Sequence, residues 1–141
     1  FITLFLAVID TQANSSTYAR AGHEPSLLGK QTRDGEFVVS KLHGGGMALG
    51  MVPPHLFEEM IEDCESSFER NDMLVLYTDG VTEAANSEKE EFGTHRLSEL
   101  LASSPRSSAK DFNRMLVKQL DEFSAADSER DDVTLLTVKR V

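Results

Sequence analysis

The chain has one cysteine, no tryptophan and no long hydrophobic run. Cys64 cannot form a disulfide within the chain, and it has no Cys or His companion at the spacing of a zinc site. This usage is typical of proteins in a reducing cytoplasm, so we expect a cytoplasmic protein. The most apolar run, residues 1–9, is far too short to cross a membrane and lacks the basic flank of a signal peptide. We therefore expect no direct membrane insertion and no targeting segment.

Basic residues are also scarce. The 14 Lys and Arg residues oppose 24 Asp and Glu residues, which gives a formal net charge of -10. No stretch of Lys or Arg is dense enough to form a cationic stripe, so neither nucleic acid nor an anionic membrane surface is an expected partner. At 141 residues the chain is long enough for one compact core and too short for two well-supported domains. Because a strong strand pattern begins at Phe1 without an initiator Met, we expect a piece of a longer protein.

Patterns typical of strands occupy most of the first half of the chain. Residues 1–9 are β-branched, aliphatic or aromatic at nearly every position, which favours a strand covered on both faces. Polar residues 11–16 predict a turn, after which residues 17–21 alternate enough to pair back as a hairpin. Residues 26–28 and 36–42 predict a second hairpin, because an Asp-Gly turn signal lies between them.

The middle of the chain contains a loop, an ambiguous segment and a buried strand. Glycine-rich residues 43–50 predict a tight backbone crossing rather than a phosphate cradle, because no Lys-Ser or Lys-Thr pair completes a P-loop. The apolar residues within 57–68 fit both a helical stripe and one face of a strand, so periodicity alone leaves this segment open. Residues 71–72 predict a turn, and the apolar residues 73–77 predict a short buried strand.

Helical patterns dominate the rest of the chain, before one final strand. Residues 93–101 predict one helix, and the pair Ser107-Ser108 predicts the cap of another. An acidic loop at residues 127–132 leads into a last strand at residues 133–138. Strands followed by helices and one more strand indicate the α+β class. The second helix has a stripe of apolar residues at three- and four-residue steps, which predicts one buried face: Ala109, Phe112, Leu116, Leu120 and Phe123.

Carboxylate groups stand at the ends of two apolar strands. Asp79 closes the buried strand in the middle of the chain, and Asp131 and Asp132 open the last strand. Magnesium and manganese prefer oxygen ligands, and a rigid strand end positions an oxygen better than a mobile loop does. Because neighbours in an extended segment point to opposite faces, we expect only one of Asp131 and Asp132 to bind a given ion.

Several motifs occur together in one order and carry a family resemblance. The most specific are Tyr77-Thr-Asp-Gly-Val-Thr-Glu83 and Asp131-Asp-Val-Thr134. The others are Phe1-Ile-Thr-Leu-Phe5 with its continuation to Asp10, Ala21-Gly-His-Glu-Pro25, Gly45-Gly-Met-Ala-Leu-Gly50, Phe92-Gly93 and the residues 71–76 that precede Tyr77. With these motifs the chain resembles the C-terminal stretch of the bacterial PPM family, the type 2C metal-dependent protein serine/threonine phosphatases, in the branch of the stage II sporulation protein E. The resemblance covers essentially all 141 residues.

This resemblance implies a fold and a metal site. The fold would be a partial α-β-β-α sandwich, with two antiparallel sheets flanked by helices. Asp79 and Asp131 map onto two aspartates that hold two divalent cations, Mn2+ or Mg2+, and no catalytic residue is expected beyond the metal ligands. We expect Gly80, His23 and Asp132 to lie beside these ligands.

The resemblance also defines what lies outside the chain. The family's earlier metal-binding motifs precede the part that matches Phe1. We therefore expect residues 1–141 to be the C-terminal portion of a single phosphatase domain whose N-terminal portion is absent, and to be inactive alone. Asn71-Asp72 replaces the more usual Gly-Asp turn, a mild change because Asn tolerates turn geometry. For residues 57–68 the resemblance favours a strand.

The implied function is metal-dependent hydrolysis of phosphoserine or phosphothreonine on a protein substrate, by hydroxide from a water that both cations share. The family branch implies a regulator in a sigma-factor partner-switching pathway. Its phosphorylated partner would be an anti-sigma-factor antagonist, and a sensor domain would lie in the parent chain.

Three alternatives stay open. One is a non-catalytic phosphoprotein-binding or scaffold module with a degenerate phosphatase fold. Another is a structural α+β domain whose acidic residues lie only on the surface. For His23 itself, a loop histidine that fixes a turn is as good an interpretation as a residue that lines the site.

Overall fold

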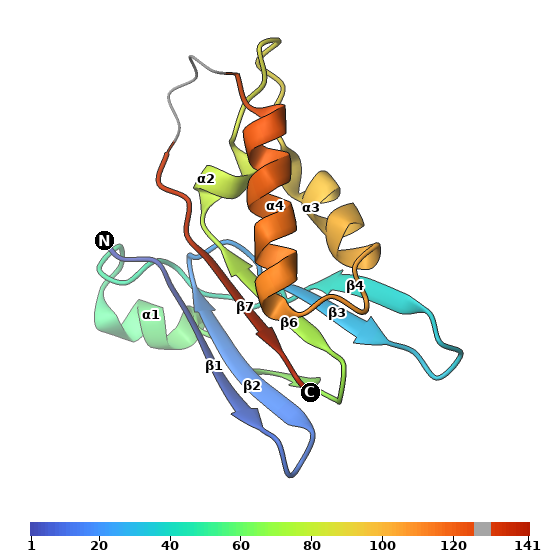
Figure 1. The fold of residues 1–141 in the computed structure, drawn as a ribbon. Coiled ribbons are helices and arrows are strands. Elements are labelled where there is room, and N and C mark those ends of the chain that lie inside the picture. The colour runs from blue at the N-terminus through green and yellow to red at the C-terminus, as the bar shows by residue number, and fades with distance from the viewer. Residues whose placement is uncertain (126–130) are drawn as a thin grey trace.

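The computed structural model describes residues 1–125 and 131–141. These residues form two antiparallel sheets with helices (Figure 1). The four-stranded sheet has the order β4-β3-β6-β7 and is called the covered sheet below; the three-stranded sheet has the order β1-β2-β5 and is called the open sheet. In chain order the elements are β1 (Leu4–Asp10), β2 (Ser15–Ala21), β3 (Leu27–Gln31), β4 (Phe37–Lys41), α1 (Pro54–Met60), β5 (Cys64–Ser67), β6 (Met73–Tyr77), α2 (Asp79–Thr82), α3 (Gly93–Ala102), α4 (Ala109–Phe123) and β7 (Leu135–Lys139).

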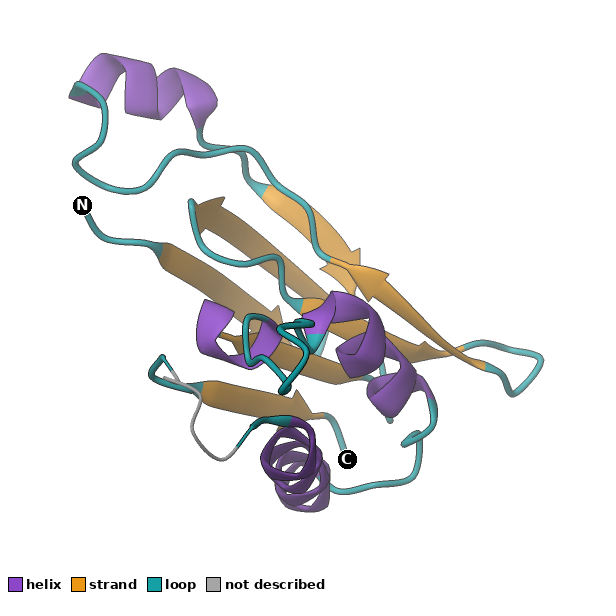
Figure 2. Cartoon of the chain, turned by 90° about the horizontal axis from the view of Figure 1, so that it is seen from above, coloured by secondary structure: helices purple, strands orange, loops and turns teal. Residues whose placement is uncertain are grey.

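Helices α3 and α4 pack on the outer face of the covered sheet. Phe112, Leu116 and Leu120 of the predicted stripe are buried there, and the predicted cap is present, because the Ser108 side chain accepts a hydrogen bond from the Asp111 amide. Figure 2 shows these helices on the same side of the molecule as β7, whereas α1 lies apart from them beyond the sheets. The apolar period of α4 therefore predicted its buried face correctly.

Strand β6 runs through the centre of the covered sheet and is buried on both faces. Met73 and Val75 pack with the helices, while Leu74 packs in a second core between the two sheets. The prediction of a short buried strand at residues 73–77 is confirmed. This strand fixes the position of the segment that follows it.

Strand β1 forms one edge of the open sheet. Its inward residues Phe5 and Ala7 pack in the core between the sheets, where the Phe5 ring stacks on that of Tyr18 with centroids 5.6 Å apart. Its outward residues Leu6 and Val8 are 58% and 65% exposed. The prediction that both faces of this strand are covered is wrong for the described residues, because none of their elements packs over the outer face.

Both predicted hairpins are confirmed. Strands β1 and β2 pair in antiparallel register from Leu4↔Ala21 to Asp10↔Ser15. Strands β3 and β4 likewise pair antiparallel, around a turn at residues 32–36.

The glycine-rich loop at residues 43–50 crosses β2 at close range, as predicted. A Cβ at Gly46 would overlap the carbonyl oxygen of Arg20, and the Gly22 amide donates to the Gly46 carbonyl at 3.1 Å. The Arg20 guanidinium donates to the Gly44 carbonyl at 2.9 and 3.2 Å. Only residues without a side chain allow the two backbones this approach.

The segment at residues 57–68 contains both structures that the sequence left open. Its beginning continues the helix α1, which starts directly after Pro53 with Pro54 in its first turn. Its end forms β5, which pairs with β2 in the register Tyr18↔Cys64. The preference for a strand over the whole segment is therefore wrong for its first residues, because the two prolines favour a helix start.

The last strand begins at Leu135, two residues later than predicted. Thr134 donates its amide to the Thr78 hydroxyl instead of to a carbonyl of β6, so the ladder has not yet started there. Residues 127–130 of the predicted acidic loop lie outside the described residues. Within the described residues, no helix is long and apolar enough to cross a membrane.

Candidate metal centre

The chain turns sharply where β6 ends. Thr78 has extended backbone angles, and Asp79 is the first residue of the one-turn helix α2, which continues with the buried residues Gly80 and Val81. Asp79 itself is exposed. A carboxylate thus projects to the surface from a backbone that is fixed on one side by a central strand and on the other by core packing.

Gly80 is the point where the segment before β7 crosses the end of β6. A Cβ at Gly80 would lie 2.6 Å from the carbonyl oxygen of Asp132 and 3.1 Å from that of Asp131. The first of these distances is too short for a real Cβ against a backbone atom, so the crossing requires glycine. It brings Asp79 and Asp131, which are far apart in the sequence, to the same end of the covered sheet.

Thr78 holds this crossing in place with both its backbone and its side chain. Its hydroxyl donates to the Asp132 carbonyl at 3.0 Å and accepts from the Thr134 amide at 2.9 Å. Its own amide donates to the Thr134 carbonyl at 3.1 Å. Sequence reasoning missed this residue, because its role depends on the register of two distant segments and its only signal is its place before Asp79.

Each of the two candidate carboxylates has one oxygen held and one oxygen free. Oδ1 of Asp79 accepts from the Gly80 amide at 3.0 Å, and Oδ1 of Asp131 accepts from the Asp132 amide at 2.8 Å. The second oxygen of each carboxylate accepts no hydrogen bond from the described residues. This chemistry fits a hard cation, because one bond orients the group and anionic lone pairs are left for coordination.

A small cavity of about 80 Å³ lies beside Asp79. The lining residues flank strands of both sheets: one precedes β1, three follow β2 and two follow β6. They are Thr3, Gly22, His23, Glu24, Thr78 and Asp79. Neither Asp131 nor Asp132 lines it. Thr3 and Glu24 were not predicted, since only the packing of the two sheets places them next to Asp79.

His23 is held in this cavity by its neighbours. Its ring nitrogen Nδ1 lies 3.4 Å from the Thr3 hydroxyl, and its carbonyl accepts from the Arg20 guanidinium at 2.7 Å. The Tyr77 hydroxyl donates to the Pro25 carbonyl at 2.9 Å and so ties the His23 loop to β6. Burial raises the pKa of Tyr77 above its ordinary value, in keeping with a hydroxyl that donates from a buried position.

The described residues do not form a full set of metal ligands by themselves. Among residues 1–125 and 131–141, no group of three or more His, Cys, Asp or Glu side chains could hold a metal ion. The carboxylates of Asp79 and Asp131, on two crossing segments, would fit a cation that takes its other ligands from outside the described residues. The alternation argument does not separate Asp131 from Asp132, because both lie ahead of β7 rather than in a strand. The choice of Asp131 therefore stays a prediction.

Comparisons with known proteins agree on the kind of protein. Residues 1–141 match the family described as stage II sporulation protein E (SpoIIE). Protein IcfG of Synechocystis sp. is 36% identical over 141 residues, which cover 99% of this chain and 21% of that protein. Phosphoserine phosphatase RsbU of Bacillus subtilis is 32% identical over 143 residues, which cover 99% of this chain and 39% of that protein. The chain thus spans well under half the length of these relatives.

Solved structures share the fold. The SiaA-PP2C domain of Pseudomonas aeruginosa superposes with a TM-score of 0.76 at 24% identity, over 96% of this chain and 50% of that one. The phosphatase domain of the cell fate determinant SpoIIE from Bacillus subtilis, presoaked with manganese, gives 0.69 at 18% identity, over 98% of this chain and 56% of that one. These similarities confirm the α+β sandwich of two antiparallel sheets with flanking helices that the sequence predicted.

Proposed function

The chain belongs to the stage II sporulation protein E family of PP2C-type phosphatase domains, and on this premise we propose that its parent protein hydrolyses phosphoserine or phosphothreonine on a protein substrate. We propose Asp79 and Asp131 as ligands of two divalent cations, Mn2+ or Mg2+. The observation that carries this proposal is the crossing at Gly80, which places two carboxylates with free oxygens at one end of the covered sheet. The name of the relative RsbU, a phosphoserine phosphatase, supports the substrate class.

The residues of this chain have separate tasks in the proposed site. Asp79 and Asp131 would hold the cations, which would neutralise the phosphate and supply an acidified water as the nucleophile. Gly80 admits the backbone of Asp132, whose carbonyl is held by Thr78, and His23 lines the cavity beside Asp79. A chain with a net charge of -10 repels a phosphate monoester, so the cations would also reverse the local field.

We further propose that residues 1–141 are the C-terminal portion of one phosphatase domain. The chain spans only half of the SiaA-PP2C chain, and its described residues hold two candidate ligands rather than a full set. The exposed apolar face of β1 is a surface that the rest of such a domain could cover. On this basis residues 1–141 alone should release little or no phosphate from p-nitrophenyl phosphate, and robust manganese-dependent turnover by them would contradict the proposal.

We also propose a cellular setting for this activity. The relatives RsbU and IcfG are much longer than this chain, which supports a parent protein that also carries a sensor domain. The family resemblance supports a cytoplasmic regulator in a sigma-factor partner-switching pathway, with a phosphorylated anti-sigma-factor antagonist as its partner.

The test is phosphate release by the parent protein with and without manganese. Asp79→Asn and Asp131→Asn should each lower the rate at least about a hundredfold, because an amide binds a hard cation poorly. Gly80→Ala should also lower it, since its Cβ would press on the Asp132 carbonyl. The matched control is Asp34→Asn, an exposed aspartate in the β3–β4 turn, which should change nothing.

Each outcome separates the proposal from its rivals. Full activity of both Asp79→Asn and Asp131→Asn would refute the metal site, and a dead Asp132→Asn beside a normal Asp131→Asn would move the ligand by one residue. A parent protein that binds a phosphoserine peptide but never turns it over would instead be a non-catalytic binding module.

A further inference from the structure

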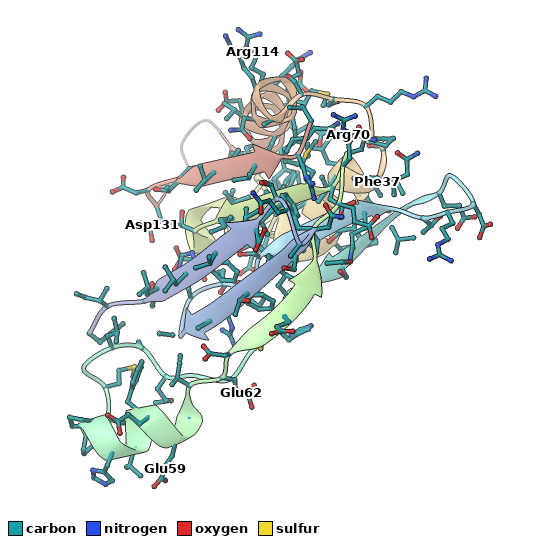
Figure 3. The ribbon with its side chains drawn as sticks, turned by 90° about the horizontal axis from the view of Figure 1, so that it is seen from below. Phe37, Glu59, Glu62, Arg70, Arg114 and Asp131 are labelled. Carbon is teal, nitrogen blue, oxygen red and sulfur yellow. The ribbon has the colours of Figure 1, made fainter. Side chains whose placement is uncertain are left out.

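A second charged region lies at the end of the covered sheet opposite Asp79. Asn71 precedes β6 and Asp79 directly follows Thr78 at its other end, so the length of the strand separates the two regions. Figure 3 labels Arg70, next to Asn71, on the other side of the view from Asp131. A pocket of about 420 Å³ opens there, lined by Gln31, Gly35, Asn71, Pro105, Arg106 and Lys139.

This pocket has the opposite charge to the rest of the protein. The chain contains 24 acidic and 14 basic residues, yet the lining includes an arginine, a lysine and two amide side chains but no carboxylate. Asp34 and Glu36 flank Gly35 in the turn without lining the pocket. The nearby Asp72 carboxylate already accepts hydrogen bonds from the backbone amides of Glu69 at 2.8 Å and Gln31 at 3.4 Å.

Lys139 carries a charge without a counter-ion in the described structure. Its ammonium donates to the carbonyls of Pro105 at 2.9 Å and Ser107 at 2.7 Å, which are neutral acceptors. It takes part in none of the four ion pairs between described residues. Burial lowers the pKa of Lys139, as expected for a cation that is partly withdrawn from water. An anion in the pocket would compensate this charge.

Arg106 lines the same pocket as Lys139. Its neighbours Pro105 and Ser107 are the two residues whose carbonyls bind Lys139. The guanidinium of Arg106 is exposed and donates no hydrogen bond to any residue that the structure describes. A planar guanidinium and an ammonium that line one pocket match the oxygens of a phosphate group, because the first binds two oxygens and the second adds a point charge.

We propose that this pocket binds a dianionic phosphate group, held by Arg106 and Lys139 with the side-chain amides of Gln31 and Asn71 as further donors. The group could be inorganic phosphate or the phosphoryl end of a phosphorylated side chain, and both present the same oxygens. The pocket is larger than a bare phosphate, so it also has room for the atoms that carry one. This inference is independent of the proposed metal centre, since it uses none of its residues.

The experiment is calorimetric titration of the parent protein with inorganic phosphate and with O-phosphoserine, in excess EDTA. The chelator removes the divalent cations, so phosphate binding that depends on a metal centre is absent. We expect one site with a millimolar or tighter dissociation constant. Arg106→Gln should weaken binding at least about tenfold, because a hydrogen bond between charged groups is lost.

The control is Arg114→Gln, an exposed arginine on α4 that lies 3.7 Å from Asp111 and outside the pocket. It should bind both probes like the wild type, and both variants should keep the wild-type melting temperature because both side chains are exposed. Tighter binding of O-phosphoserine than of phosphate supports a phosphorylated side chain, and equal binding supports free phosphate. No binding of either probe at tens of millimolar, or equal weakening by Arg106→Gln and Arg114→Gln, overturns the proposal.

Discussion

The two sheets differ in what lies over their outer faces. Helices α3 and α4 pack over the covered sheet, and Met73 and Val75 of β6 are completely buried. None of the described elements packs over the open sheet, and Leu6 and Val8 of β1 are more than half exposed. Both strands are apolar runs of similar composition, so their neighbours, and not their own residues, decide how much of each is removed from water.

This difference also divides the proposed metal centre. The covered sheet leads to the carboxylates of Asp79 and Asp131, on segments fixed by core packing and by the Thr78 hydrogen bonds. The open sheet supplies Thr3 and His23, which line the neighbouring cavity. The groups that we propose as cation ligands thus stand on the better-buried side, where a fixed geometry is easier to maintain.

The largest expected effect is a loss of stability on the covered side. Phe112→Ala should lower the free energy of unfolding of the 141-residue chain by about 3–5 kcal/mol, because it empties a fully buried ring position. Leu6→Ala on the open side should cost less than about 0.5–1 kcal/mol, since its side chain is already largely in water. Urea unfolding of the two variants measures both values. Equal losses would show that the open face is covered in solution.

The next effect is association through the open face. The stripe of Leu4, Leu6 and Val8 lies on an edge strand, a combination that favours pairing between copies. The 141-residue chain should therefore form dimers or larger species as its concentration rises, and Leu6→Lys should reduce them. Val117→Lys on α4, at a comparably exposed apolar position, should not. Light scattering that finds a clean monomer at high concentration would contradict this expectation.

Sequence reasoning succeeded where a pattern depends on residues close in the chain. The period of Phe112, Leu116 and Leu120 predicted a buried helix face, and the apolar run at residues 73–77 predicted a buried strand. Asp79 and Asp131 were selected from the sequence, and the structure brings their segments to one crossing, although their role as ligands stays a prediction.

It failed where the outcome depends on partners far along the chain. The apolar residues of β1 predicted cover on both faces, but the cover of an outer face is a property of other elements. The crossing at Gly80 had no signal beyond an Asp-Gly pair, which also suits an ordinary turn. Thr78 contacts Asp132 and Thr134 only because of the final arrangement of β6 and β7.

A smaller effect separates stability from chemistry at the covered sheet. Asp79→Asn should change the free energy of unfolding of the metal-free protein by less than about 1 kcal/mol, because two weak effects oppose each other. The amide relieves repulsion from Asp131 and Asp132, but it also removes a negative charge from the first turn of α2. Thermal unfolding in EDTA measures the change. A loss comparable to that of Phe112→Ala would mean that Asp79 is needed for folding rather than for binding a cation.

The smallest effect is a pair of opposite pH dependences, one from each sheet. Burial raises the pKa of Asp72, ahead of β6, despite its hydrogen bonds from the Glu69 and Gln31 amides. The Ala13 and Gln12 amides donate to Asp10, at the end of β1, and lower the pKa of that exposed carboxyl. A raised pKa in the folded state means that the stabilising contribution of Asp72 is present at low pH. This contribution is lost as the pH rises through the raised pKa. For Asp10 the contribution is present above the ordinary aspartate pKa and is lost as the pH falls.

The test compares each Asp→Asn variant with the wild type across the acid range, because the difference in unfolding free energy isolates the one group removed. As the pH rises, Asp72→Asn should become more stable relative to the wild type, and Asp10→Asn should become less stable. The sign is diagnostic, since any constant cost of the amide shifts a whole curve without changing its slope. Two slopes of the same sign would mean that Asp72 is as open to water as Asp10. The contrast between a covered and an open sheet would then not extend to this end of the molecule.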